Sequence, residues 1–93
     1  MIRSFSDAET KKVWQEERSR RLPQDIQQRA LNKLAMLSQA SDINDLRVPP
    51  SNRLEVLSGD RKGQYSIRIN QQWRICFRWE AGSAWDVGIV DYH

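Results

Sequence analysis

The chain has 93 residues, of which 39% are hydrophobic and 29% are charged, and these values are typical of one globular domain spanning residues 1–93. No apolar run approaches the roughly 20 residues that a membrane-spanning helix needs, and the polar N-terminus argues against a signal peptide. One cysteine and one histidine exclude an internal disulfide and a Cys/His zinc site. We therefore expect a cytosolic protein with no membrane partner, no metal and no other cofactor.

The formal net charge of +3 is distributed unevenly along the chain. Residues 1–46 carry eight basic and seven acidic side chains, whereas residues 47–78 carry seven basic and two acidic ones. Six of those seven basic residues are arginines, whose planar guanidinium can bind two phosphate oxygens at once. On charge alone two interpretations stay open: this segment binds a polyanion such as nucleic acid, or its basic side chains only solvate the outer face of a sheet.

The chain is expected to open with a short strand over residues 2–5 and then to form a helix. Ser6 and Glu9 have the spacing of a capping box, in which each side chain satisfies a free backbone N–H at the start of a helix. This helix should run to about Glu17.

A second helix is predicted to begin at Pro23, because proline suits the first helical position, and to end near Ala40. Its apolar residues recur at three- and four-residue spacing and should face the core: Ile26, Ala30, Leu34 and Leu37. Residues 48–52 contain two prolines and should form a stiff loop.

From residue 53 onward the hydrophobic period becomes two, which predicts β-strands. The expected strands are residues 54–57, 64–70, 73–79 and 85–92, with turns at 58–63 and 80–83. The order β-α-α-β-β-β-β indicates an α+β fold, in which two helices pack on one face of a mainly antiparallel sheet.

The alternation within the two central strands assigns their side chains to opposite faces. The face directed at the helices should carry Tyr65, Ile67, Ile69, Trp73, Ile75, Phe77 and Trp79. The opposite face should be open and carry Arg68, Arg74 and Arg78 together, an arrangement that suits the binding of phosphates. Cys76 lies on the same side of its strand and should be a small, buried or half-buried packing residue.

The last three residues, Asp91, Tyr92 and His93, gather groups that can transfer protons or form hydrogen bonds. Histidine has the unperturbed pKa that suits acid–base catalysis near neutral pH, and neighbouring carboxylates favour its protonated form, a general acid. A terminal histidine is more often a frayed residue without a role. Spacing alone does not decide between the two.

Several segments together resemble the HigB branch of the RelE/ParE toxin superfamily. They are residues 59–63 (GDRKG), 65–68 (YSIR), 72–75 (QWRI) with Phe77, and 90–93 (VDYH). The resemblance implies a microbial-RNase-like fold and a toxin that enters the ribosomal A site and cleaves mRNA during translation. It also implies a HigA-type helix-turn-helix antitoxin that neutralises the toxin and represses the shared operon, which links the toxin indirectly to operator DNA.

The same resemblance assigns active-site positions to Arg74, Asp91, Tyr92 and His93. Glu55 and Ser58 stand where the family usually has a histidine and a lysine, so a carboxylate replaces an imidazole and one cation is missing. The further candidates for contact with RNA or its phosphates are Arg53, Ser58, Arg61, Lys62, Arg68 and Arg78.

RNA cleavage without a metal uses the ribose 2′-OH as the nucleophile and needs a base, an acid and cations at the phosphate. Glu55 is the candidate base, His93 the candidate acid, and Arg68 and Arg74 the phosphate-binding cations. Two structural alternatives stay open: Glu55 pairs at the surface with Arg53 or Arg68, or Arg74 forms an ion pair with Asp91.

Two other functions compete with the ribonuclease. ParE-like members of the superfamily inhibit DNA gyrase without cutting RNA, and they have no chemical need for the pair Tyr92 and His93. A weakened toxin could instead act mainly as a co-repressor of its own operon, a possibility that Glu55 and Ser58 leave open.

Overall fold

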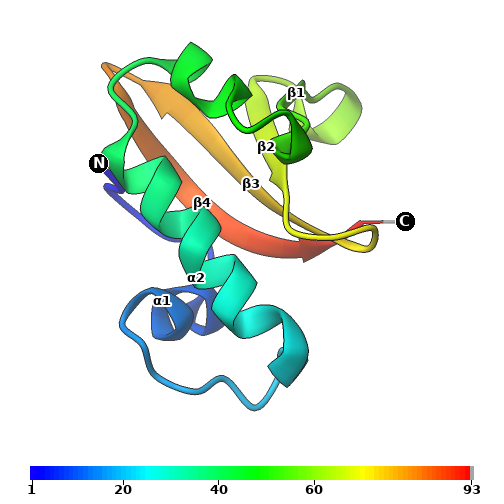
Figure 1. Ribbon diagram of the computed structural model, residues 1–93. Helices are drawn as coiled ribbons and strands as arrows, with labels where there is room; N and C mark the ends of the chain where they lie inside the picture. The colour runs from blue at the N-terminus through cyan, green and yellow to red at the C-terminus, as the bar shows by residue number, and fades with distance from the viewer. Residues whose placement is uncertain (93) are drawn as a thin grey trace.

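A four-stranded antiparallel sheet and two α-helices make up most of the computed structural model, which describes residues 1–92 (Figure 1). The helices are α1 (Ala8–Trp14) and α2 (Gln24–Gln39), and the strands are β1 (Glu55–Val56), β2 (Gln64–Arg68), β3 (Trp73–Glu80) and β4 (Ser83–Asp91). Three short 3-10 helices, η1 (Ile43–Arg47), η2 (Pro50–Asn52) and η3 (Gly59–Arg61), lie in the connections. None of the helices in this part of the chain has the length and apolarity to cross a membrane.

The strands follow one another in the order β1-β2-β3-β4, each antiparallel to its neighbour. The segment predicted as an opening strand forms two isolated parallel bridges to β4, Ile2 with Ala84 and Phe5 with Val87. The four named strands are thus antiparallel, as the sequence predicts, and the N-terminal segment runs along the outer edge of β4.

The start and the end of α1 both differ from the prediction. Asp7, not Ser6, is the N-cap, and its carboxylate accepts a hydrogen bond from the Thr10 backbone N–H at 2.7 Å. Glu9 does not close a capping box, because its carboxylate accepts a hydrogen bond of 2.7 Å from the Ser19 hydroxyl. The helix ends at Trp14 rather than near residue 17, since Glu16 adopts a left-handed backbone conformation with φ 61°.

The hydrophobic core lies between α2 and the sheet, and Figure 1 shows α2 crossing in front of β4. Pro23 takes the N-cap position, one residue before the helix, and the helix ends where predicted, with Ala40 as its C-cap. The predicted stripe on α2 is buried and clusters with Ile69, just after β2, and with residues of the three longer strands: Ile67, Ile75, Phe77, Ala84, Val87 and Ile89. The predicted apolar face of β2 and β3 is therefore confirmed, with Tyr65, Trp73 and Trp79 partly buried at its margin.

Two strands are shorter than predicted, for local reasons. β2 ends at Arg68, because the Asn70 side chain accepts hydrogen bonds from the backbone N–H groups of Gln72 and Trp73, both at 2.8 Å, and thereby forms a tight turn. β1 has only two residues, and it follows Arg53, whose φ of 45° breaks the extended conformation. Both irregular segments border the Arg74 site described below.

Candidate active site

Arg74 is the centre of the candidate site, and its surroundings differ from those predicted. The residue is only 7% exposed, so it does not lie on an open face of the sheet. Its Nε donates a hydrogen bond of 2.8 Å to the Ser66 hydroxyl on β2, and its Nη2 donates one of 2.6 Å to the Arg53 carbonyl. Its Nη1 lies 3.9 Å from a carboxylate oxygen of Glu55 on β1. Burial of this guanidinium is possible because neighbouring acceptors satisfy it.

Tyr92 completes this group from the end of β4. The Arg74 Cζ lies 5.4 Å from the centroid of the Tyr92 ring, a cation–π distance. Tyr92 remains 39% exposed, so the ring also contacts solvent. Glu55, Arg74 and Tyr92 come from three different strands or strand ends and are brought together by the sheet.

Gln72 holds the end of β4 in place. Its carbonyl accepts a hydrogen bond of 2.6 Å from the Tyr92 backbone N–H, and its side-chain Nε2 donates one of 3.1 Å to the Asp91 carboxylate. Asp91 is thus located beside Gln72 and Trp73, and the Arg74 guanidinium pairs with Glu55 instead. His93, the candidate acid, lies outside the described residues.

Glu55 is accessible to solvent. Its side chain is 48% exposed, whereas that of Arg74 is 9% exposed. The proposed surface partners of this carboxylate, Arg53 and Arg68, are not the ones observed in residues 1–92, where its ion pair is with Arg74. The pair therefore joins a fixed, buried cation to a carboxylate at the surface.

Arg78 lies on the same strand as Arg74 but in different surroundings. Its Nε donates a hydrogen bond of 2.7 Å to Asp86, and its Nη1 donates one of 2.8 Å to Glu80. The hydrogen bond to Asp86 is the main reason that the pKa of the Arg78 guanidinium is raised above its usual value. The expected group of three arginines on one open face does not form, since Arg74 is buried and Arg78 is paired with two carboxylates.

The remaining candidates come from β2 and from the turn before it. Arg68 is the cross-strand partner of Arg74, is half-buried, and donates from Nε to the Asn70 carbonyl at 3.0 Å. The candidates of the η3 turn are all exposed: Ser58, Arg61 and Lys62. The Arg61 Nη1 donates to the Gln64 side chain at 3.2 Å.

Cys76 is buried, as predicted, at 1% exposure. Burial raises the pKa of its thiol, and the charges of Arg61 and Arg74 act in the opposite direction. The same face of the sheet therefore holds a buried thiol within the electrostatic reach of both arginines.

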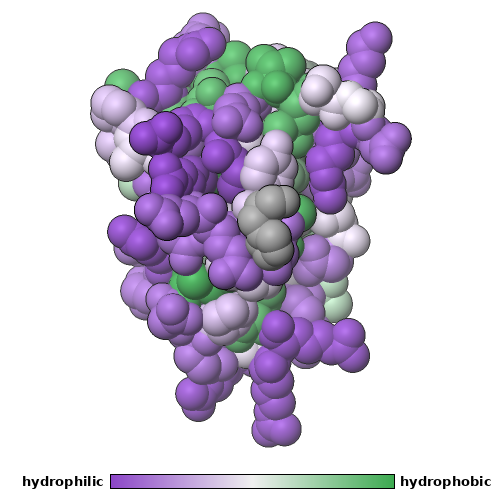
Figure 2. Space-filling view, turned by 90° about the vertical axis from the view of Figure 1, so that its right-hand side faces the viewer, coloured by the Kyte–Doolittle hydropathy of each residue, from purple (hydrophilic) through white to green (hydrophobic). Residues whose placement is uncertain are grey.

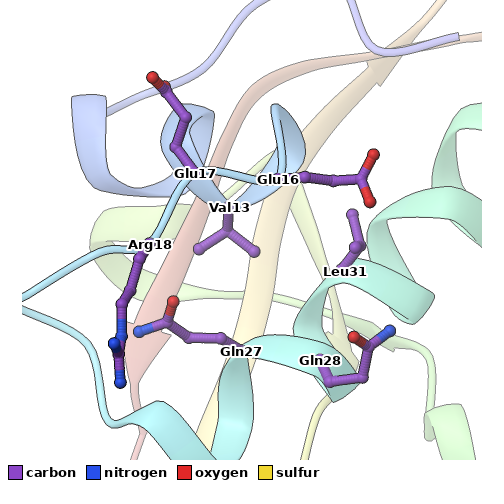
Figure 3. A pocket seen from close by; sticks show the side chains of 7 residues that line it. All are labelled: Val13, Glu16, Glu17, Arg18, Gln27, Gln28 and Leu31. Atoms are coloured by element: carbon purple, nitrogen blue, oxygen red, sulfur yellow. The ribbon is translucent and has the colours of Figure 1, made fainter.

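The side of the molecule on which β4 ends is mostly hydrophilic, as Figure 2 shows. A different hollow, between the end of α1 and α2, is shown in Figure 3. Its walls include the carboxylates of Glu16 and Glu17 and the apolar side chains of Val13 and Leu31, and none of the predicted site residues lines it. Within residues 1–92, no three metal-ligating side chains of the His, Cys, Asp or Glu type lie together.

The sequence interpretation missed two kinds of residue at this site. Ser66 and Gln72 orient Arg74 and the end of β4, and their uncharged side chains give no signal in a pattern of charges. Arg29 and Lys33 on α2 line a hollow together with Arg53 and Arg68. Their spacing of four residues on the polar side of α2 was the available signal.

Comparison of the sequence with known proteins gives three results. A family model described as "RelE-like toxin of type II toxin-antitoxin system HigB" matches residues 3–93. A Vibrio cholerae protein named Toxin HigB-1 is 39% identical over 85 residues, covering 90% of each chain. A Proteus vulgaris protein named Endoribonuclease HigB is 30% identical over 93 residues, covering both chains completely.

A solved structure also matches the fold. It is a chain of a YoeB-YefM complex from Staphylococcus aureus, with a TM-score of 0.61 and 16% sequence identity, and the match covers all of this chain and 98% of the other. At this identity the likeness concerns the arrangement of helices and strands alone.

Proposed function

Because this chain belongs to the HigB-like toxins, RelE-like toxins of type II toxin–antitoxin systems, we propose that it is an endoribonuclease that cleaves mRNA in the ribosomal A site. The observation that carries the proposal is the buried Arg74, held by Ser66 and Arg53 between an accessible carboxylate and a half-exposed tyrosine. A fixed guanidinium with a base beside it is what transfer of a phosphoryl group to a ribose hydroxyl requires. A relative that covers the whole chain is named an endoribonuclease, which favours this activity over gyrase inhibition and over a role as co-repressor alone.

The proposed reaction is attack of the ribose 2′ oxygen on the adjacent phosphorus. The Glu55 carboxylate takes the proton of the 2′-OH as the new P–O bond forms. The bond to the 5′ oxygen breaks, and His93 donates the proton that this leaving oxygen needs. The products are a 2′,3′-cyclic phosphate and a free 5′-OH, so the atoms and protons balance.

Arg74 stabilises the additional negative charge on the phosphate during this reaction. Its geometry suits the task, because Ser66 and the Arg53 carbonyl already fix the guanidinium plane and little reorganisation remains. Tyr92 offers a ring on which an RNA base can stack, since it is both held by Gln72 and exposed. Asp91 accepts a hydrogen bond from the same glutamine and pairs across the sheet with Trp73 of β3, and in this proposal it orients this end of the site.

The proposed partners follow from the family. A HigA-type antitoxin with a helix-turn-helix would neutralise the toxin and bring it to operator DNA. The matched solved structure is itself described as a YoeB-YefM complex. The ribosome would present the mRNA strand to the Arg74 site.

The test is single-turnover cleavage of mRNA on programmed ribosomes, with the wild type and His93→Gln compared across a pH range. Glutamine keeps part of the hydrogen bonding of histidine but has no titratable proton, so loss of the general acid should slow cleavage roughly 10²–10⁴-fold. The limb of the pH profile due to the imidazole should also disappear. Equal rates would remove His93 from the reaction. Intact mRNA with inhibited gyrase would overturn the ribonuclease assignment as a whole.

A further inference from the structure

A second concentration of positive charge lies beside the Arg74 site, in a hollow between α2, the segment before β1, and the turn that joins β2 to β3. Four cationic residues line it: Arg29 and Lys33 from α2, Arg53, and Arg68 from the end of β2. The hollow has a volume of about 380 Å³. Among the described residues, none of those that line it is acidic.

These four cations lack a neutralising partner in the part of the chain that the structure describes, since its ion pairs involve other basic residues. The contacts they do make are to neutral groups. The Lys33 ammonium donates to the Asn52 side-chain carbonyl, and Arg68 donates to the Asn70 carbonyl. Burial, and then the charge of Arg29, lower the pKa of Lys33, as expected for an ammonium without a counter-ion.

One wall of the hollow is held by a buried residue, so the hollow does not arise only from long, exposed side chains that happen to lie close together. Asn52, which accepts from Lys33, is fully buried, and its Nδ2 donates a hydrogen bond of 3.1 Å to the Leu46 carbonyl. The position of the Lys33 ammonium is therefore fixed by a hydrogen bond to a buried side chain that is itself hydrogen-bonded to the backbone. Like charges held together in this way are stabilised when an anion binds between them.

The hollow adjoins the Arg74 site through Arg53 and Arg68. The backbone carbonyl of Arg53 accepts a hydrogen bond from the Arg74 guanidinium, while the Arg53 residue also lines the hollow. Arg68 lies directly across the β2–β3 ladder from Arg74. A polyanionic strand whose phosphate lies at Arg74 would therefore bring a neighbouring phosphate within reach of the hollow.

We propose that the hollow lined by Arg29, Lys33, Arg53 and Arg68 binds a second backbone phosphate of the RNA strand that is cleaved at Arg74. This inference rests on the proposed ribonuclease function. It assigns to α2 a role in holding the substrate, in addition to its role in the core. The four cations supply affinity and register and take no part in bond cleavage.

The test uses two 2′-O-methyl RNA probes, which bind but cannot be cleaved: a dinucleoside monophosphate and a hexanucleotide. The Arg29→Gln/Lys33→Gln variant is compared with Lys11→Gln/Arg20→Gln, a control that removes the same charge at exposed positions outside the hollow. We expect the first variant to bind the hexanucleotide about tenfold more weakly at low salt. The slope of log K against log[salt] should become shallower by roughly 0.7 for each phosphate that the variant no longer binds. Binding of the dinucleoside monophosphate by the first variant, and of both probes by the control variant, should match the wild type.

Three results would overturn the inference: an unchanged salt slope, an equal loss of affinity in the control variant, or a loss seen on ribosomes but not with the free hexanucleotide. The last would assign the hollow to ribosomal RNA instead of the substrate strand.

The single variant Arg29→Gln is a control for misfolding, because Arg29 is exposed, and it should lose part of the affinity. If the wild type fails to cleave mRNA on ribosomes, the proposed function fails. If the wild type cleaves and the double variant binds the hexanucleotide normally, only the hollow is misassigned.

Discussion

Arg74 and Arg78 lie four residues apart on β3, yet they are held in opposite ways. Arg74 is buried, hydrogen-bonded mainly to neutral oxygens, and 3.9 Å from one carboxylate. Arg78 is more exposed and contacts two carboxylates, Asp86 at 2.7 Å and Glu80 at 2.8 Å. The two-residue period of a strand thus assigns each arginine to a face of the sheet, whereas the residues on neighbouring strands decide whether its charge is neutralised.

The largest expected difference is between Arg74→Ala and Arg78→Ala. Loss of Arg74 should slow cleavage of ribosome-bound mRNA about 10³-fold, because a fixed donor at the phosphate is removed. Loss of Arg78 should leave the rate within a few-fold of the wild type. Single-turnover rates measure both effects, and similar rates for the two variants would contradict the assignment of different roles to Arg74 and Arg78.

Folding must be checked for the Arg74 variant. Alanine leaves the Ser66 hydroxyl and the Arg53 carbonyl without their partner, at a cost of about 1–3 kcal/mol per group that stays buried and unpaired. Arg74→Lys keeps the positive charge but cannot reproduce the planar fork. A folded Arg74→Lys protein with a strongly reduced rate would show that geometry, as well as charge, is needed.

A smaller difference is expected between two exposed carboxylates, Glu55 beside Arg74 and Glu80 beside Arg78. Glu55→Gln should slow cleavage about 10²-fold, since the amide cannot accept the 2′-OH proton. Glu80→Gln should have no measurable effect on the rate. The two variants change charge equally, so comparable losses would point to long-range electrostatics instead of a general base.

Much of the fold could be predicted from the sequence, because it depends on long, regular patterns. The stripe on α2 and the alternation on β2 and β3 both identify side chains that are buried in the structure. The errors lie where a single side chain competes with the pattern. Asp7 displaces Ser6 as the cap of α1, and Asn70 ends β2 two residues early.

The site was predicted less completely, for a different reason. Its candidate residues stand out in the sequence by their chemical type, but the burial of Arg74 depends on Ser66 and on a carbonyl at residue 53, which come into contact only when β1, β2 and β3 pair. The neutralisation of Arg78 likewise depends on Asp86 of β4, whose position follows from a bulge opposite residues 76–78. Register and bulges are tertiary features that a period of two does not reveal.

The smallest expected effect is on stability, and it comes from weakening the ion pair between Arg78 and Asp86. Asp86 has φ 52°, a conformation that asparagine also tolerates, so Asp86→Asn changes the charge without straining the backbone. It removes the charged acceptor of the Arg78 Nε, and because both side chains are more than one-third exposed, only a small loss of stability is expected. Urea unfolding at low and high salt measures this, and the difference from the wild type should shrink as salt screens the pair. Cleavage should be unchanged. A reduced cleavage rate in Asp86→Asn would show that the Arg78 end of β3 also contacts the RNA, and the distinction between the two arginines would then fail.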